Sequence, residues 1–282
     1  TLSLALSQLG CEVSLLAMNT RKHFYQKAEL PPQAAHFARI RTVPIDNRIK
    51  PSAAFLNLFS NDSYHIARFV SPAYEQALRE MLQDVQYDVV QLETLYLAPY
   101  VDTIRRYSQA RISMRAHNVE HEIWERISSH TGNVVKRWYL KHLTGKLKQY
   151  EVRSLEQYDM LLPITERDLR YFRKLGYENP AIVTPIGIRA QEFPEARPLT
   201  TAKPSISFIG SLDWMPNIEG LHWFIQKVWP TIHQRFPELE FHIAGRNTPT
   251  SLMQLKRPNV FVHGEVPESD PFIAQRCMMV VP

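Results

Sequence analysis

Cysteine is scarce in this chain. The two cysteines, Cys11 and Cys277, lie near opposite ends of the 282 residues and form no spacing pattern. This arrangement argues against a disulfide framework and against a zinc site, and it fits a reducing compartment. We therefore expect a cytoplasmic protein that needs no metal.

Long apolar runs are also missing. No run approaches the roughly 18 residues that a helix needs to span a bilayer, and the N-terminus lacks the basic-then-apolar layout of a signal peptide. The sequence also has no internal repeat and no low-complexity tract. We expect a protein that is not itself transmembrane.

The charge balance is mildly basic, with 33 Lys and Arg against 28 Asp and Glu, a net charge of +5. Such a charge allows attraction to nucleic acid, anionic lipid or a nucleoside diphosphate without choosing among them. The basic residues form no patch interleaved with aromatics, so no nucleic-acid partner is expected. The length favours two domains.

Short apolar segments alternate with helical ones along the chain, which predicts an α/β fold with mainly parallel sheets. The predicted strands cover residues 12–17, 39–45, 87–92, 111–115, 159–163, 181–185, 206–209, 241–244 and 260–262. The proline-rich segment 193–204 predicts a linker. It divides an N-terminal domain, 1–190, from a C-terminal domain, 200–282, and ligands of such sheets bind in a cleft at the strands' carboxyl edges.

A long helical segment is predicted over residues 120–157, and its two faces differ. The apolar arc holds Tyr139, Leu143, Leu147 and Tyr150, and the opposite arc holds Arg137, Lys141 and Lys148. The first face is expected to pack. The second face is either a solvated basic surface or a peripheral contact with anionic lipid headgroups.

Residues 205–246 form a βαβ pattern. An apolar strand leads to Gly210 and Ser211, then to a long amphipathic helix and a second strand that ends at Gly245. The backbone amides of the first turn and the start of the helix could hold a phosphate. The other interpretation is a tight connection that needs glycine for its geometry alone.

Four stretches together resemble family 4 of the GT-B glycosyltransferases, and the resemblance covers nearly the whole chain. They are RAHNVEHEIWERI (115–127), PITERDLRYFRKLG (163–176), TPIGI (184–188) and FIGSLDWMPNIEGLHWFIQKVWP (208–230). The resemblance implies two Rossmann-like domains facing a cleft. It also implies retaining transfer of a sugar from a nucleoside diphosphate sugar to an acceptor in the N-terminal domain, without a further cofactor.

On the acceptor side, His117 matches the family's histidine at the end of an N-terminal-domain strand, where it faces the transferred sugar. An imidazole can donate or accept a hydrogen bond to a sugar hydroxyl. Asn118 and Glu120 are expected to help orient it. The alternatives are a structural histidine, a turn role for Asn118 and a first-turn acid for Glu120.

On the donor side, Gly210 and Ser211 match the family's turn against the donor phosphates. Many members carry an Arg after this Gly and a Lys about six residues later, whereas this chain has Ser211 and Asn217. Arg246, which follows Gly245, is the expected substitute cation; its alternative is an exposed loop residue. Gly264 and Val266 match positions that contact the nucleotide base through the backbone.

The family comparison predicts a chain truncated at both ends. The first strand of the N-terminal domain is expected before Thr1, and an EGFG-like turn and a second glutamate are expected beyond Pro282. Without them the fragment is expected to be inactive alone.

The predicted function is hexosyltransferase-like transfer to a glycan or lipid-linked acceptor, in cell-surface polysaccharide or glycolipid synthesis at the inner face of the membrane. Two rival hypotheses remain, a GT-B nucleotide-sugar epimerase and a non-catalytic nucleotide- or glycan-binding protein.

Overall fold

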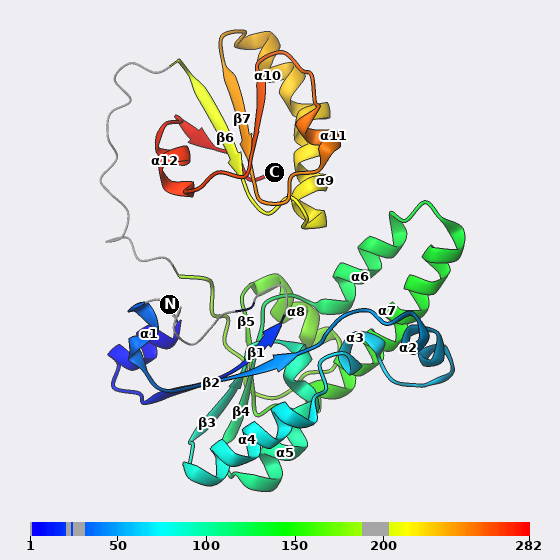
Figure 1. Cartoon of the computed structure of the whole chain (residues 1–282), viewed down its shortest axis with the longest axis vertical. Helices are drawn as coiled ribbons and strands as arrows, with labels where there is room; N and C mark the ends of the chain where they lie inside the picture. The colour runs from blue at the N-terminus through cyan, green and yellow to red at the C-terminus, as the bar shows by residue number, and fades with distance from the viewer. Residues whose placement is uncertain (1, 21–23, 25–31, 188–202) are drawn as a thin grey trace. The chain divides into compact units, whose positions relative to one another are not determined.

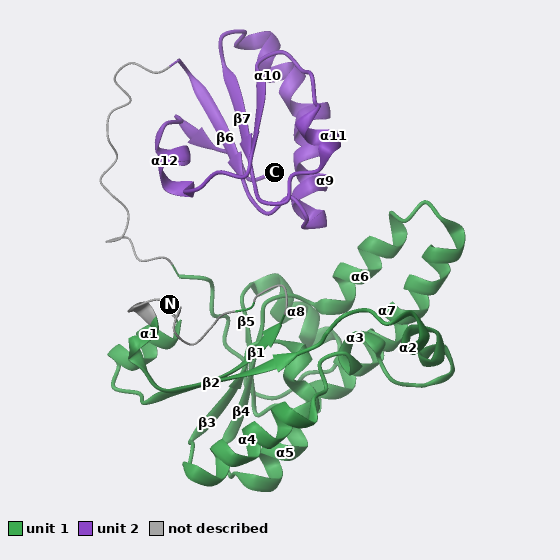
Figure 2. Cartoon of the chain, in the orientation of Figure 1, with its two compact units in different colours: residues 1–189 green, residues 190–282 purple. Residues whose placement is uncertain are grey.

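The computed structural model describes residues 2–20, 24, 32–187 and 203–282. The chain divides into two compact units, Thr1–Arg189 and Ala190–Pro282 (Figure 2). Each unit has its own apolar core. The predicted linker 193–204 lies, apart from its last two residues, outside the described residues.

Unit 1 contains two parallel sheets. In the first, β1 (Val13–Thr20) pairs with β2 (Phe37–Ile45). The second has the order β3 (Val89–Leu92), β4 (Arg111–Ala116) and β5 (Met160–Pro163). Because all pairs are parallel, the carboxyl ends of β3, β4 and β5 meet at one edge.

The helices of unit 1 connect these strands and bury them. The α-helices are α1 (Leu2–Gln8), α2 (Pro51–Leu56), α3 (Tyr64–Ala67), α4 (Pro72–Asp84), α5 (Val101–Tyr107), α6 (Glu120–Ser129), α7 (Val134–Ser154) and α8 (Glu166–Lys174), and the 3-10 turns are η3 (Pro32–His36), η4 (Asn57–Phe59), η5 (Leu95–Tyr100) and η6 (Leu155–Gln157) (Figure 1). Ile104, Ile112, Leu147 and Leu161 from α5, β4, α7 and β5 are almost fully buried together.

An apolar pocket of about 420 Å³ lies between β1 and β3. Residues 14–18 line one wall and residues 89–93 line the other, while Leu78 and Leu82 of α4 line it as well. Within the described residues, β1 pairs only with β2, and β3 only with β4. The Tyr74 hydroxyl donates to the Leu16 carbonyl at 3.2 Å.

The long helical segment predicted over 120–157 is divided in the structure. α6 ends at Ser129 and α7 begins after Asn133, whose side chain accepts a hydrogen bond from the Lys136 N–H at 2.9 Å. Gly132 and Asn133 supply a turn residue and an N-cap, so two helices replace one. The predicted strand 181–185 lies along β5 without forming a full strand: Ala181 bridges to Leu161, and the N–H groups of Ile182 and Thr184 donate to the Leu161 and Pro163 carbonyls at 3.1 and 2.8 Å.

Unit 2 is a four-stranded parallel sheet with the order β8-β7-β6-β9. The strands are β6 (Ser205–Ile209), β7 (Glu240–Ala244), β8 (Val260–Gly264) and β9 (Met278–Met279). The chain adds β7 and β8 on one side of β6 and then crosses to place β9 on the other. This is doubly wound topology, with its switch point between β6 and β9.

Helices cover both faces of this sheet. α9 (Met215–Trp223), α10 (Trp229–Arg235) and α11 (Thr250–Met253) lie on one side and α12 (Ser269–Ala274) on the other (Figure 1). The π-helical turn η8 (Phe224–Val228) joins α9 to α10, so the predicted long helix is present with a wider turn inside it.

Candidate functional site

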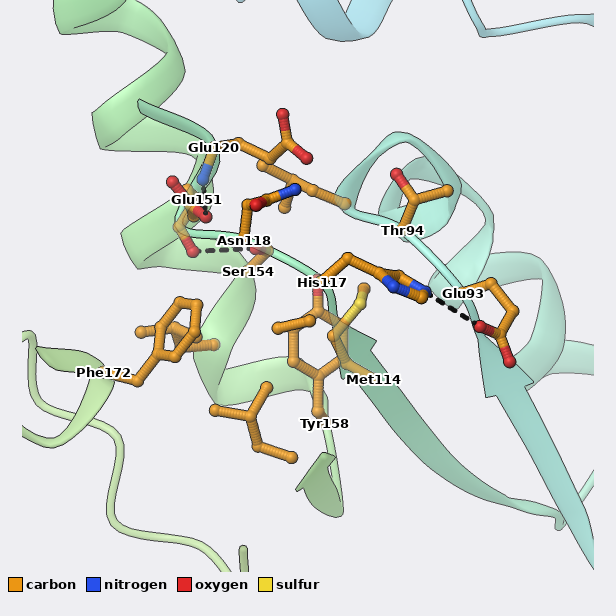
Figure 3. A pocket seen from close by; sticks show the side chains of 14 residues that line it. Glu93, Thr94, Met114, His117, Asn118, Glu120, Glu151, Ser154, Tyr158 and Phe172 are labelled. Carbon is orange, nitrogen blue, oxygen red and sulfur yellow. Dashed lines mark hydrogen bonds and ion pairs between the residues drawn. The ribbon is translucent and has the colours of Figure 1, made fainter. Parts of the chain in front are cut away.

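The carboxyl end of β4 delivers His117 to a polar cluster. Its Nε2 lies 3.1 Å from Oε2 of Glu93 (Figure 3). The Arg115 guanidinium lies 3.4 Å from the same oxygen. Glu93 directly follows β3, the parallel neighbour of β4. The two side chains meet because parallel neighbours end at the same edge. Both remain accessible, with 39% and 48% of the side chain exposed.

A pocket opens beside this cluster (Figure 3). His117, Glu93, Thr94 and Asn118 give it polar groups at the strand ends. Its apolar walls come from Met114, Leu155, Tyr158, Leu161 and Phe172. With a volume of about 30 Å³, the pocket has room for about one or two water molecules, so a sugar would meet the accessible His117, Glu93 and Asn118 at its mouth and not its apolar walls.

Glu120 points to a different partner. The Tyr96 hydroxyl donates to Oε2 of Glu120 at 3.1 Å. Burial raises the pKa of Glu120 to about 7; the Tyr96 hydrogen bond opposes this shift, and the nearby Glu151 charge adds to it. Among the described residues, the recorded partner of the His117 ring is Glu93, and neither Asn118 nor Glu120 is recorded as bonding to it. Asn118 is exposed.

Glu151 of α7 caps the start of α6. Its carboxylate accepts the N–H groups of Glu120 at 3.0 Å and His121 at 3.1 Å, and it lies 2.6 Å from Nδ1 of His121. Nε2 of His121 in turn lies 3.2 Å from the Tyr171 hydroxyl. His121 and Glu151 are both buried, so these hydrogen bonds fix the start of α6, the helix that follows the His117 loop.

Sequence reasoning did not single out Glu93 or Glu151. The position of Glu93, directly after a strand whose neighbour ends at His117, is the signal that could have found it. Glu151 carries no such signal, because it lies within a helix and meets its partners 30 residues away in sequence.

In unit 2 the expected donor residues gather at the carboxyl ends of β6, β7 and β8. The Gly210 N–H donates to the Ala244 carbonyl at 3.3 Å, and the Gly245 N–H donates to the Gly264 carbonyl at 2.8 Å. A Cβ on Gly245 would overlap the carbonyl oxygen of Gly210. Glycine at 245 is therefore required by the close approach of two loops, whatever else it does.

The polar side chains of this turn are linked by hydrogen bonds within the turn and to the neighbouring loop. The Ser211 hydroxyl donates to Asp213 at 2.6 Å, and the Asn217 amide donates to the Ser211 carbonyl at 3.0 Å. Asn247 donates to the other oxygen of Asp213 at 3.2 Å, which ties the β6 loop to the β7 loop. Ser211 and Asn217 thus stabilise the turn that carries Gly210.

Arg246 is the cation beside this turn. Its carbonyl accepts the Leu212 N–H at 2.8 Å, while its side chain is exposed. Gly264 adopts a left-handed φ of 73° at the end of β8, and Val266 follows it, half-buried. Gly210, Gly245, Arg246 and Gly264 therefore share one edge, at which open α/β sheets bind ligands.

The described residues contain neither a metal-binding cluster nor a membrane-spanning helix. In residues 2–20, 24, 32–187 and 203–282, no group of three or more His, Cys, Asp or Glu is arranged to hold a metal ion. None of the described helices combines the length and apolar character that crossing a membrane requires.

Residues 203–282 match the family described as Glycosyl transferases group 1. Comparison with curated protein sequences finds no significant match. Among solved structures, the chain is similar to the sucrose-phosphate synthase of Thermosynechococcus elongatus, with 15% identity and a TM-score of 0.61 over 97% of this chain and 65% of that one.

Two further structures have the same fold. One is a UDP-forming trehalose-phosphate synthase from Burkholderia xenovorans, with 11% identity and a TM-score of 0.53 over 94% of this chain and 76% of that one. The other is an E. coli trehalose-6-phosphate structure bound with UDP-2-fluoro glucose, with 12% identity and a TM-score of 0.50 over 96% and 71%.

The predicted fold class is confirmed: the chain has the α/β fold with parallel sheets of the GT-B glycosyltransferases. The match of residues 203–282 to glycosyl transferases group 1 agrees with the resemblance seen in that part of the sequence, and the assignment to family 4 stays a prediction. The chain spans about two thirds to three quarters of the length of these structures. At 11–15% identity, the likeness to these structures shows the fold.

Proposed function

We propose that the chain forms the donor-binding and acceptor-side parts of a retaining glycosyltransferase that uses a nucleoside diphosphate sugar. One observation carries the proposal. The Gly210 turn ends β6 beside the switch point of a doubly wound sheet, within the segment that matches glycosyl transferases group 1. Diphosphates bind at such turns because backbone amides and a helix N-terminus face the anion.

Unit 2 binds the donor in this proposal. The diphosphate lies against the Gly210 turn and the start of α9, and the Arg246 guanidinium supplies the positive charge that Ser211 and Asn217 cannot. Ser211 and Asn217 keep the turn in shape through their hydrogen bonds. The nucleotide base contacts the backbone at Gly264 and Val266.

Unit 1 supplies the acceptor-side residues. His117 hydrogen-bonds a hydroxyl of the transferred sugar, and Glu93 positions the imidazole from the neighbouring strand. Asn118, exposed in the same loop, contacts the same ligand. The departing diphosphate assists acceptor deprotonation, so the side chains contribute orientation and electrostatics more than a strong base.

The finer parts of the proposal concern the substrates and the location. We propose a hexose donor, a glycan or lipid-linked acceptor and a role in cell-surface polysaccharide or glycolipid synthesis. The family resemblance supports these choices. We place the protein in the cytoplasm, with a peripheral contact at the inner face of the membrane supported by the exposed Lys141 on α7.

Donor binding tests the proposal directly. Calorimetric titration of the chain with UDP and with GDP is expected to detect binding, and Arg246→Gln is expected to weaken it about tenfold or more, since hydrogen bonds to charged groups contribute about 1.5–3 kcal/mol. Lys256→Gln is the matched control, because it removes an exposed cation of the same unit. Equal affinity of Arg246→Gln and the parent chain would remove Arg246 from the site.

Turnover separates the rival hypotheses. Transfer should depend on an added acceptor and should fall in His117→Ala. Acceptor-independent appearance of an epimerised sugar would favour the epimerase, and donor binding without any product in the full-length protein would favour the binding protein. Undiminished transfer by His117→Ala would remove His117 from its role.

A further inference from the structure

Large apolar side chains are exposed on two neighbouring segments of unit 1. The first segment, α2 with η4, presents Phe55, Leu56 and Phe59, and the second, the start of α7, presents Val134, Val135 and Trp138. Each of these six side chains is 61–80% exposed. Phe55 and Phe59 contact each other edge to face, with ring centroids 5.7 Å apart.

The two segments are in contact through their other faces. The Tyr139 hydroxyl donates to the Ala54 carbonyl at 3.3 Å, and the Lys146 ammonium donates to the Asn57 carbonyl. Leu143 packs in a small core with Ala54. Figure 1 shows α2 beside α7 accordingly. The inward faces of the two segments therefore pack against each other, while the six apolar side chains on their outer faces are exposed to solvent. We call these six side chains the apolar surface.

Charge on these segments has one sign. Residues 47–60 and 130–149 contain seven Lys and Arg and no Asp or Glu. They are Arg48, Lys50, Lys136, Arg137, Lys141, Lys146 and Lys148. Lys136 and Lys141 are exposed on α7, within about two turns of Val134, Val135 and Trp138. Four of these cations are paired or buried: Arg48 and Lys50 pair with Asp46, Lys148 pairs with Glu125, and Lys146 is buried. Lys136, Arg137 and Lys141 of α7 are the cations that border the apolar surface.

We propose that the apolar surface docks on an anionic lipid bilayer. Aromatic and aliphatic side chains enter the interfacial region while Lys and Arg remain at the headgroups, which is how monotopic proteins bind membranes. Nucleic acid, the alternative anionic partner, would pair with the cations but would leave the apolar side chains of Leu56, Val134 and Val135 exposed to water. The proposal rests on and deepens the peripheral membrane contact proposed above for α7, and it does not depend on glycosyl transfer, because it is measured without donor or acceptor.

Co-sedimentation of the chain with vesicles tests the proposal. Binding is expected to vesicles of phosphatidylcholine with phosphatidylglycerol, to be weaker to phosphatidylcholine alone, and to fall as salt is raised. Equal binding to both vesicles, or binding to neither, would overturn the proposal. Failure to bind leaves the donor titration unaffected, so the two proposals are tested separately.

Two double variants separate the apolar from the electrostatic contribution. Phe55→Ser with Phe59→Ser is expected to weaken binding about tenfold or more because two large side chains no longer leave water. Lys136→Ser with Lys141→Ser is expected to weaken it about thirtyfold at low salt. All four side chains are exposed, and circular dichroism checks that each variant folds.

Matched controls lie in unit 2. Trp223→Ser with Phe236→Ser removes two aromatics that are each 55% exposed, and Lys256→Ser with Arg257→Ser removes two exposed cations. Neither should change vesicle binding, and an equal loss in either control would overturn the assignment to the apolar surface. Two further results would also overturn the assignment. One is a dimer, seen by sedimentation equilibrium, that dissociates in Phe55→Ser with Phe59→Ser. The other is binding of poly(U) that is lost only in Lys136→Ser with Lys141→Ser.

Discussion

Among single residues, Glu120 has a carboxyl group whose ionisation the fold opposes. Its side chain is mostly buried, its nearest hydrogen-bond donor is the Tyr96 hydroxyl, and its pKa rises from 4.5 to about 7. A carboxyl group with a raised pKa binds a proton more tightly in the native state than in the unfolded state. Its contribution to stability is fully present below pH 4.5 and is lost as the pH rises toward 7.

Glu120→Gln should remove this pH dependence. The amide keeps an acceptor for Tyr96 but cannot ionise, so the variant should gain stability relative to the parent chain by about 3 kcal/mol between pH 4.5 and pH 7. Urea unfolding at a series of pH values measures the difference. Tyr96→Phe should make the parent's loss larger, because the hydroxyl stabilises the charged form. A constant difference between Glu120→Gln and the parent would contradict the assignment.

Gly245→Ala should destabilise unit 2. The added methyl group would overlap the Gly210 carbonyl and crowd Leu212, so the β6 and β7 loops must separate. We expect a loss of at least about 2 kcal/mol in unfolding free energy, together with weaker donor binding. Gly145→Ala is the matched control: Gly145 lies in α7 with open space around it, and its replacement should stabilise by up to about 1 kcal/mol. Equal stability of the two variants would exclude the steric argument.

Single site residues were predictable only in part. The pattern of strand followed by loop placed His117 and Gly210 at strand ends, whereas their roles, and that of Arg246 as a substitute cation, came from the family resemblance and stay predictions. Glu93 and Glu151 were missed. They reach their partners across 24 and 30 residues, and such contacts depend on tertiary packing that no local pattern encodes.

At the scale of elements, α6 depends on a cap that another helix provides. The residue before it, Val119, offers no side-chain acceptor, and Glu151 of α7 fills that role. Glu151→Ala would leave two N–H groups and the His121 ring without their acceptor in a buried place. We expect a loss of about 3 kcal/mol or more in unfolding free energy and faster hydrogen exchange at Glu120 and His121.

Glu156→Ala is the comparison for this variant. Glu156 is exposed in η6, and its replacement should change stability by no more than about 0.5 kcal/mol. If Glu151→Ala proved as mild as Glu156→Ala, water rather than Glu151 would be satisfying the start of α6.

Most elements followed from their local pattern. The strands of both units lie within two or three residues of the predicted ranges where hydrophobic runs are flanked by turns, as at β4 and β7. Residues 181–185 have the apolar composition of a strand and lie along β5, with the N–H groups of Ile182 and Thr184 donating to the Leu161 and Pro163 carbonyls, but only Ala181 forms a bridge, to Leu161. Whether an apolar segment forms a strand depends on the strand it pairs with, and a local sequence pattern does not identify that strand.

For the whole molecule, the separate cores of the two units lead to a thermal prediction. No buried residue belongs to both core clusters among the described residues. Calorimetry should therefore resolve two transitions, with Glu151→Ala lowering one and Gly245→Ala lowering the other. A single transition that shifts as a whole in both variants would contradict independent unfolding.

The sequence pattern predicted the class of fold, but it could not predict the order of the strands in each sheet. Alternation of strand and helix predicts parallel pairing, but the placement of β9 beside β6, opposite β7, depends on packing that brings α12 to the other face. That placement creates the switch point on which the donor proposal rests.

The pocket between β1 and β3 has a consequence for how the chain behaves in concentrated solution. Each strand presents to it an edge without a strand partner in the described part of the chain, and such edges are templates for any extended apolar segment. We expect these edges to favour self-association of the chain at high concentration. A short extended peptide that filled the gap would act as a solubilising agent, because it would satisfy both edges at once.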